Sequence, residues 1–206
     1  MKNDHRPRMF QRNSARIIFV GVVVILGFFF YIFWDLPSLD ALPETFMTPS
    51  VRITDRNDRL LYEILPQEGG RNTVLSIENI PQCLKDATIA VEDKNFYTNP
   101  GFDLTGIARA LWINLKGGET VAGGSTITQQ VARNLLLSQE ERTERTLRRK
   151  LREAVLAAQM TRKLSKDEIL ALYLNQINYG GLAYGVEAAA QTYFGKPASE
   201  LLLPEC

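Results

Sequence analysis

Histidine and cysteine are scarce in this chain, and their scarcity excludes several kinds of site. The 206 residues include one histidine, His5, and two cysteines, Cys83 and Cys206. Zinc sites draw their ligands mainly from these two residue types, so no zinc site is expected. The two cysteines do not make a disulfide framework, and the sequence gives no argument for pairing Cys83 with the last residue, Cys206.

The chain also lacks a charge bias. Its 24 lysines and arginines nearly balance 23 aspartates and glutamates, which gives a formal net charge of +1. A nucleic-acid-binding surface requires an excess of basic residues, so no nucleic-acid partner is expected. The hydrophobic fraction is 45%, and there is no internal repeat or low-complexity tract. This composition is typical of a folded protein rather than a disordered one.

The chain does contain a long apolar run near its start. Residues 17–34 carry no charge and would span roughly 27 Å as a helix, close to the hydrocarbon thickness of a bilayer. Basic residues dominate positions 1–16, whereas acidic residues follow the run, so a single-pass helix with a cytoplasmic N-terminal tail is predicted. His5 then lies on the cytoplasmic side, and the outer domain has no histidine base. A cleaved signal peptide is the alternative, but the run is long for one and no small-residue cleavage site follows.

The remainder divides into a linker and one domain. Residues 35–50 contain three prolines, which predicts an extended linker. Residues 51–206 are numerous enough for one domain with a real core. Alternating apolar residues over 51–65 flank a polar turn and predict a β-hairpin. Beyond it the fold is expected to be mainly α, with helices at 81–92, 104–115, 144–164, after the capping sequence Ser165 to Glu168, and at 186–193.

One glycine-containing loop indicates a ligand site. Residues 123–134 read GGSTITQQVARN, in which Ser125 or Thr126 can cap a helix. The amide groups and positive dipole end of such a helix favour an anion, so a phosphorylated or sugar ligand is one interpretation. The alternative is that these residues only cap the helix.

Two acidic segments are candidates for chemistry. Glu92 and Asp93 stand where a predicted helix meets a loop, a place from which a side chain can enter a cleft, although such pairs are usually solvated surface. Arg149 and Lys150 precede Glu153 by four and three residues, so all three share one helix face. That face is either an exposed ion pair or a cationic surface that holds phosphates beside a carboxylate.

Five motifs in order resemble one family, the peptidoglycan glycosyltransferases of glycosyltransferase family 51. This family occurs in class A penicillin-binding proteins and monofunctional transglycosylases. The resemblance extends from about residue 52 to the end of the chain. It rests on Glu92-Asp93-x-x-Phe96 through Gly101, on Gly123 to Gln130 with Asn134, on Arg149-Lys150-x-x-Glu153, on Glu168-Ile169-Leu170 with Tyr173-Leu174-Asn175, and on Ala188 to Ala190 with Tyr193-Phe194-Gly195-Lys196.

The resemblance implies a lysozyme-like α-helical domain that polymerises lipid II on the outer face of the bacterial cytoplasmic membrane. Glu92 would be the general base that deprotonates the sugar 4-hydroxyl of the acceptor, and the attack would release undecaprenyl pyrophosphate with inversion to a β-1,4 linkage. Glu153, with Arg149 and Lys150, would assist departure of the pyrophosphate, directly or through a divalent cation such as Mg²⁺. No other cofactor is implied.

The same transfer assigns substrate-binding residues. Ser125, Thr126, Gln130 and Arg133 would contact the sugar and phosphates of the donor, and Asp93 and Phe96 would shape the cleft. Asn99 stands where many members carry histidine, so its contribution must come from an amide that does not titrate. Arg133 replaces a more usual lysine, and Gln159-Met160 replaces a frequent Leu-Glu pair.

Partners and alternatives follow from the resemblance as well. Expected partners are lipid II, the growing glycan chain, membrane lipid, a cell-wall synthesis complex and the inhibitor moenomycin. The family domain normally continues past residue 206, so this chain is expected to be a C-terminally incomplete domain, and no Ser-x-x-Lys transpeptidase motif occurs in it. A lysozyme-like lytic enzyme and a non-catalytic lipid II binder are the alternative functions.

Overall fold

The computed structural model describes residues 7–41, 49–57, 59–66, 69–106, 112–113 and 124–206. It divides into two compact units, residues 1–36 and 37–206. The first unit is dominated by the helix α1 (Pro7–Phe33). Within α1, the 18 residues Arg16–Phe33 have a mean hydropathy of 2.6, so this segment is long and apolar enough to cross a membrane. The helix predicted from the apolar run is therefore confirmed, ending one residue earlier than expected.

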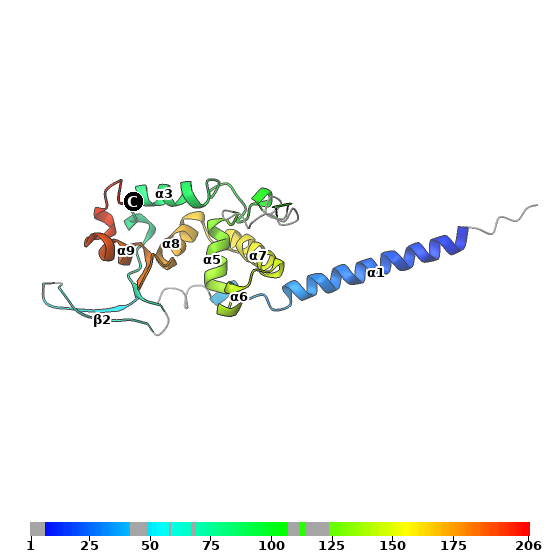
Figure 1. Cartoon of the computed structure of the whole chain (residues 1–206), viewed down its shortest axis with the longest axis horizontal. Helices are drawn as coiled ribbons and strands as arrows, with labels where there is room; N and C mark the ends of the chain where they lie inside the picture. The colour runs from blue at the N-terminus through cyan, green and yellow to red at the C-terminus, as the bar shows by residue number, and fades with distance from the viewer. Residues whose placement is uncertain (1–6, 42–48, 58, 67–68, 107–111, 114–123) are drawn as a thin grey trace, which may run out of the picture. The chain divides into compact units, whose positions relative to one another are not determined.

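The second unit contains the predicted β-hairpin (Figure 1). Strands β1 (Val51–Thr54) and β2 (Leu60–Ile64) pair antiparallel, with Val51 opposite Ile64. The Asp55 carboxylate forms the turn by accepting hydrogen bonds from the backbone amides of Asn57 and Arg59, at 2.7 and 2.9 Å. A short parallel pair, β3 (Arg71–Asn72) with β4 (Ala183–Tyr184), was not predicted because two-residue strands leave no pattern in a sequence.

Helices make up the body of the second unit. They are α3 (Gln82–Glu92), α5 (Ile127–Leu136), α6 (Gln139–Thr143), α7 (Leu147–Lys163), α8 (Lys166–Gln176) and α9 (Gly185–Phe194), with the 3-10 turns η1 (Leu39–Ala41), η2 (Ile77–Asn79) and η3 (Ala198–Glu200). The predicted helix over 104–115 lies largely outside the described residues.

The core forms where α5, α7 and α8 pack against one another (Figure 1). Each helix contributes fully buried apolar residues at helical spacing, which is why these segments fold as amphipathic helices. Ile127, Leu156, Met160, Ile169, Leu170 and Leu174 are all inaccessible to solvent.

Side-chain caps fix where several helices begin. Thr126 with Gln129, Ser138 with Glu141, and Ser165 with Glu168 form reciprocal capping boxes for α5, α6 and α8. The start of α7 differs from the prediction by three residues, because Thr146 caps the helix and Glu144, two residues before it, is extended.

Cys83 in α3 and Cys206 are joined by a disulfide, with their Cα atoms 5.9 Å apart. The pairing left open by the sequence is therefore present in the structure. The two cysteines are 123 positions apart, and over such a separation sequence spacing does not indicate whether two residues lie close together.

Candidate active site

Glu92 is the last residue of α3 and is exposed to solvent. Its Oε2 accepts a hydrogen bond of 2.7 Å from Nε2 of Gln130, which lies one turn into α5. The helix ends here because Asp93 adopts an extended backbone, with φ −158° and ψ 80°. The structure thus brings together Glu92 and Gln130, two predicted site residues that are 38 positions apart.

Asp93 has a different environment from its neighbour, because its side chain is buried. Its carboxylate oxygens accept hydrogen bonds of 3.0 and 2.9 Å from Nδ2 of Asn99, and Oδ2 also accepts one of 3.2 Å from the backbone amide of Ile127. Ile127 is the first residue of α5, so a fixed negative charge sits at the positive end of that helix. The Asp93 carboxylate therefore supplies a negative charge at this helix start, and the interpretation of residues 123–134 as a ligand site stays a prediction.

Asn99 uses both ends of its amide. Its Nδ2 donates to Asp93, and its Oδ1 accepts from the Gly101 amide at 2.9 Å and from Lys166 Nζ at 3.0 Å. Lys166, the first residue of α8, also lies 4.8 Å from the centre of the Phe96 ring, a cation–π distance. The Asn99 amide, which does not itself titrate, therefore links the Asp93 carboxylate to the Lys166 ammonium.

Phe96 and Gly101 anchor the loop that carries Asn99. The Phe96 side chain is completely buried, so it supports the loop from within. Gly101 has φ +99°, and a Cβ there would lie 2.6 Å from the backbone oxygen of Ala157 in α7. Only glycine fits this close approach of the loop to α7.

Thr126 and Ser125 make different hydrogen bonds. Thr126 is buried, and its hydroxyl donates to the Gly101 oxygen at 2.6 Å and accepts from the Gln129 amide at 3.1 Å. It therefore caps α5, as the sequence analysis allowed, and ties the helix to the loop. Ser125 is half-buried, and its Oγ accepts a hydrogen bond from Lys150 Nζ.

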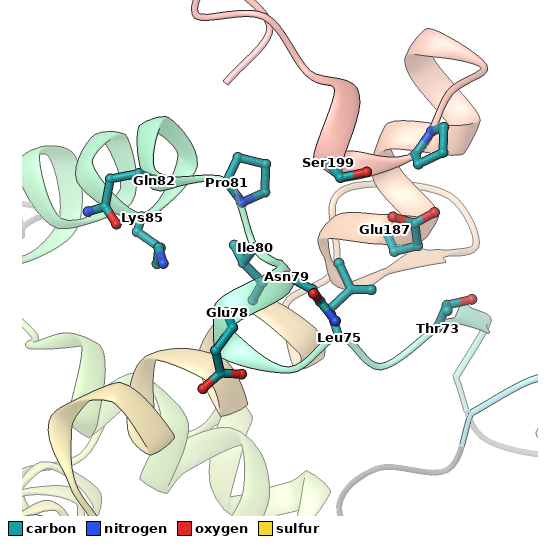
Figure 2. Close-up of a pocket in the computed structure, with 11 residues that line it drawn as sticks. Thr73, Leu75, Glu78, Asn79, Ile80, Pro81, Gln82, Lys85, Glu187 and Ser199 are labelled. Atoms are coloured by element: carbon teal, nitrogen blue, oxygen red, sulfur yellow. The ribbon is translucent and has the colours of Figure 1, made fainter.

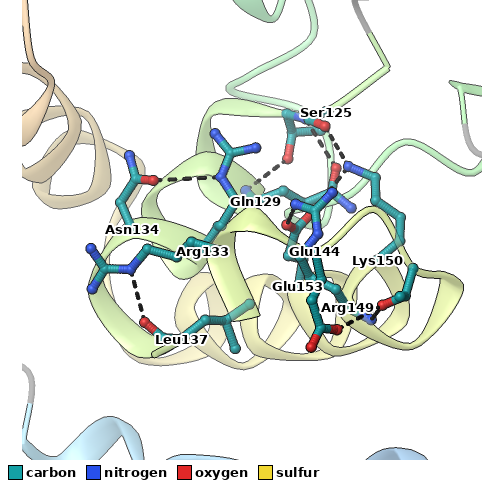
Figure 3. Close-up of polar contacts among 12 residues, drawn as sticks. Ser125, Gln129, Arg133, Asn134, Leu137, Glu144, Arg149, Lys150 and Glu153 are labelled. Carbon is teal, nitrogen blue, oxygen red and sulfur yellow. Dashed lines mark hydrogen bonds and ion pairs between the residues drawn. The ribbon is translucent and has the colours of Figure 1, made fainter. Parts of the chain in front are cut away.

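Glu153 lies between two cations on α7 (Figure 3). Its side chain is 1% exposed, and its two oxygens pair with Arg149 Nη1 at 2.5 Å and with Lys150 Nζ at 3.1 Å. The side chains of Arg149 and Lys150 are 15% and 27% exposed, so both cations retain some contact with solvent. The three residues share one face of α7, as the helical spacing predicted, and the hydrogen bond from Lys150 adds Ser125 to the cluster.

Arg133 and Tyr173 lie near Glu92. The Nε of Arg133 donates to Asn134 Oδ1 at 3.5 Å (Figure 3). Burial raises the pKa of the Tyr173 phenol from 10.0 to about 12; the charge of Glu92 adds to this effect, and that of Arg133 opposes it. Both charges therefore act on the same phenol. Sequence reasoning assigned no role to Tyr173 or Lys166, although both belong to or adjoin the fourth motif.

The cation expected near Glu153 is not supported by the residues around it. Both of its oxygens already pair with cations. Within the described ranges, no group of three His, Cys, Asp or Glu side chains could hold a metal ion. The described groups around Glu153 therefore do not form a Mg²⁺ site on their own.

A cavity of about 640 Å³ lies apart from these residues, between the start of α3 and α9 with η3 (Figure 2). Glu187 on its wall accepts hydrogen bonds from the Ala198 amide at 2.8 Å and from Gln191 at 3.0 Å. Its carboxylate thus joins α9 to η3. None of the predicted site residues lines this cavity.

A mainly helical transglycosylase domain is what the resemblance predicts, and comparison with known proteins agrees. The family model described as Transglycosylase matches residues 57–206, so the chain belongs to the transglycosylase family. This confirms the mainly α, lysozyme-like class.

Among its relatives, the chain is similar to proteins named Penicillin-binding protein 1A. It is 40% identical over 192 residues to that of Vibrio cholerae serotype O1, covering 93% of this chain and 22% of the relative. It is 43% identical over 188 residues to that of Aquifex aeolicus, covering 91% and 24%. The chain thus spans less than a quarter of the length of these relatives.

Proposed function

We propose that this chain is the peptidoglycan glycosyltransferase domain of a membrane-anchored protein and that it polymerises lipid II into β-1,4 glycan strands. The family assignment supports glycosyl transfer to peptidoglycan in general. The observation that carries the finer proposal is the contrast between an exposed carboxylate, Glu92, and a buried carboxylate, Glu153, held between two cations.

Glu92 acts as the general base in this proposal. Its carboxylate takes the proton of the acceptor 4-hydroxyl, and the resulting oxygen attacks the anomeric carbon of the donor as the bond to pyrophosphate breaks. Because Glu92 is exposed, it can return that proton to solvent after each transfer. Its hydrogen bond with Gln130 restricts the direction in which the carboxylate points.

The cluster around Glu153 receives the leaving group. Negative charge develops on the pyrophosphate as its bond to the sugar breaks, and the fixed cations Arg149 and Lys150 stabilise that charge. Ser125, bonded to Lys150, and Arg133 are proposed to contact the donor. Gln130 contacts it beside Glu92, whereas the buried residues Asp93, Phe96 and Thr126 shape the cleft with Asn99 rather than contact the sugar.

The apolar segment Arg16–Phe33 is proposed to anchor the domain with its N-terminal tail in the cytoplasm, which places the site on the face where lipid-linked substrates are polymerised. Membrane lipid, a cell-wall synthesis complex and moenomycin remain the proposed partners.

Incubation of the detergent-solubilised chain with labelled lipid II, with and without moenomycin, tests the function. Products are separated by length. Polymer whose formation moenomycin blocks supports the glycosyltransferase. Soluble sugar fragments from added glycan would instead identify a lytic enzyme, and saturable lipid II binding without product would identify a binding domain.

A further inference from the structure

Two contacts fasten the end of α3 to the start of α5. Asp93 accepts a hydrogen bond from the Ile127 amide at 3.2 Å, and one turn further along α5 Gln130 donates to Glu92 at 2.7 Å. Glu92 and Asp93 are adjacent, so a shift of Asp93 relative to α5 also moves Glu92 relative to Gln130. The orientation of the proposed base therefore depends on how firmly Asp93 is held.

Asn99 holds Asp93, but only in one of its two amide orientations. With Nδ2 toward Asp93, Oδ1 faces two donors, the Gly101 amide at 2.9 Å and Lys166 Nζ at 3.0 Å. Turning the amide over would place NH₂ against those donors and oxygen against the carboxylate. An ammonium has no acceptor, so Lys166 excludes the reversed orientation.

Lys166 occupies a position that is unfavourable for a cation by itself. It is the first residue of α8, where the helix dipole repels positive charge, and burial lowers the pKa of its ammonium while Asp93 opposes that shift. Three neighbours of Nζ offset the unfavourable helix dipole and burial: the Asn99 oxygen, the Phe96 ring at 4.8 Å and the nearby charge of Asp93. A lysine needed only for solubility would extend into solvent.

We propose that Lys166 is a positioning residue for Glu92, acting through Asn99 and Asp93 to fix the carboxylate against α5. This inference rests on the proposed function, because it concerns the orientation of the base in glycosyl transfer. Lys166 does not contact the reacting atoms. Its effect is on the alignment of Glu92, to which transfer rates are highly sensitive.

Steady-state kinetics with lipid II test the proposal, using Lys166→Met, Lys166→Arg and the control Lys163→Met. Lys163 is an exposed lysine that pairs with Asp40 at 2.5 Å. We expect Lys166→Met to lower kcat about tenfold or more with KM within about twofold, since a misaligned base slows chemistry without removing donor contacts. Lys166→Arg, which keeps a cationic donor, restores most of kcat, and Lys163→Met stays within about twofold of the parent.

A double-mutant cycle tests the route through Asn99. If Lys166 acts on Asp93 through that amide, Asn99→Ala combined with Lys166→Met is no slower than Asn99→Ala alone. Additive losses, a parent-like kcat for Lys166→Met, or an Arg variant as slow as the Met variant would overturn the proposal. All variants are compared at equal folded fraction, measured by circular dichroism.

Hydrogen–deuterium exchange separates this inference from the proposed function. If the parent makes no polymer, the function fails, but exchange still reports on the arrangement. Lys166→Met is expected to speed exchange in peptides covering 93–101 and 126–130, whereas Lys163→Met leaves them unchanged. Unchanged exchange in the Lys166→Met variant would refute the positioning role whatever the activity of the parent.

Discussion

Replacing Glu92 with glutamine removes the proposed base while conserving its shape. The glutamine oxygen can still accept the hydrogen bond that Gln130 donates to Glu92 at 2.7 Å. What disappears is the ability to take a proton from the acceptor hydroxyl, because an amide does not act as a base at neutral pH. The substitution therefore separates chemistry from architecture.

The magnitudes follow from where the side chain lies. Because Glu92 is exposed, the free energy of unfolding should change by less than about 0.5 kcal/mol. General-base catalysis contributes roughly 10²- to 10⁴-fold, so the polymerisation rate should fall by at least about a hundredfold. Donor binding should survive, because none of the cationic groups around Glu153 is altered.

The assay measures initial rates of polymer formation from labelled lipid II, with thermal unfolding and lipid II binding measured on the same preparations. Glu200→Gln, a change at another exposed glutamate, is the matched control and should retain the parent rate. A Glu92→Gln variant with more than about a tenth of the parent rate would refute the role of Glu92 as base. Loss of activity that tracks a lower unfolding temperature would refute the separation of chemistry from architecture.

Three further changes have defined outcomes. Glu153→Gln removes a charge held between two partly exposed cations. It should lower the free energy of unfolding by about 2 kcal/mol, measured by urea unfolding, and slow polymerisation in the lipid II assay. Unchanged values in both measurements would contradict the ion-pair cluster. Thr126→Val removes a helix cap and leaves the Gly101 oxygen without its hydrogen bond from the hydroxyl. The free energy of unfolding in urea should therefore fall by about 2 kcal/mol. An unaltered urea midpoint would contradict this role of Thr126. Burial favours the neutral phenol of Tyr173, so its raised pKa contributes stability that is complete below pH 10 and is lost as the pH rises toward about 12. The unfolding temperature should therefore fall more steeply over that pH range in the parent than in Tyr173→Phe. Equal slopes would show that the pKa shift is absent.

Local chemistry explains which parts of the fold could be predicted. The apolar run of α1, the hairpin turn and the capping box at Ser165 each depend on residues within a few positions of one another, and all three are present as expected. The helix α6 escaped prediction because Gln139–Thr143 is short and charged and has no apolar periodicity. The boundary of α7 was wrong by one turn, because the sequence alone did not show that Thr146 would be its cap.

In the site too, contacts between residues close in sequence could be predicted, whereas contacts that depend on tertiary packing could not. The cluster of Arg149, Lys150 and Glu153 lies within one helix turn, so its spacing alone predicted a shared face. The contact between Lys166 and Asn99 joins residues 67 positions apart and depends on how α8 packs beside the loop. The negative charge at the start of α5 also depends on tertiary structure, because Asp93 lies just after the end of another helix, α3. Sequence pattern identified the helix start but not what would occupy it.

In the proposed reaction, the complete pairing of Glu153 has a kinetic consequence. A pyrophosphate approaching Arg149 and Lys150 must share them with a carboxylate already bonded to both. This internal competitor lowers the affinity of the two cations for the product, and it re-forms its own ion pairs when the product leaves. Under the proposed mechanism, the arrangement that stabilises charge during bond cleavage would thereby also release the leaving group and free the site for the next donor.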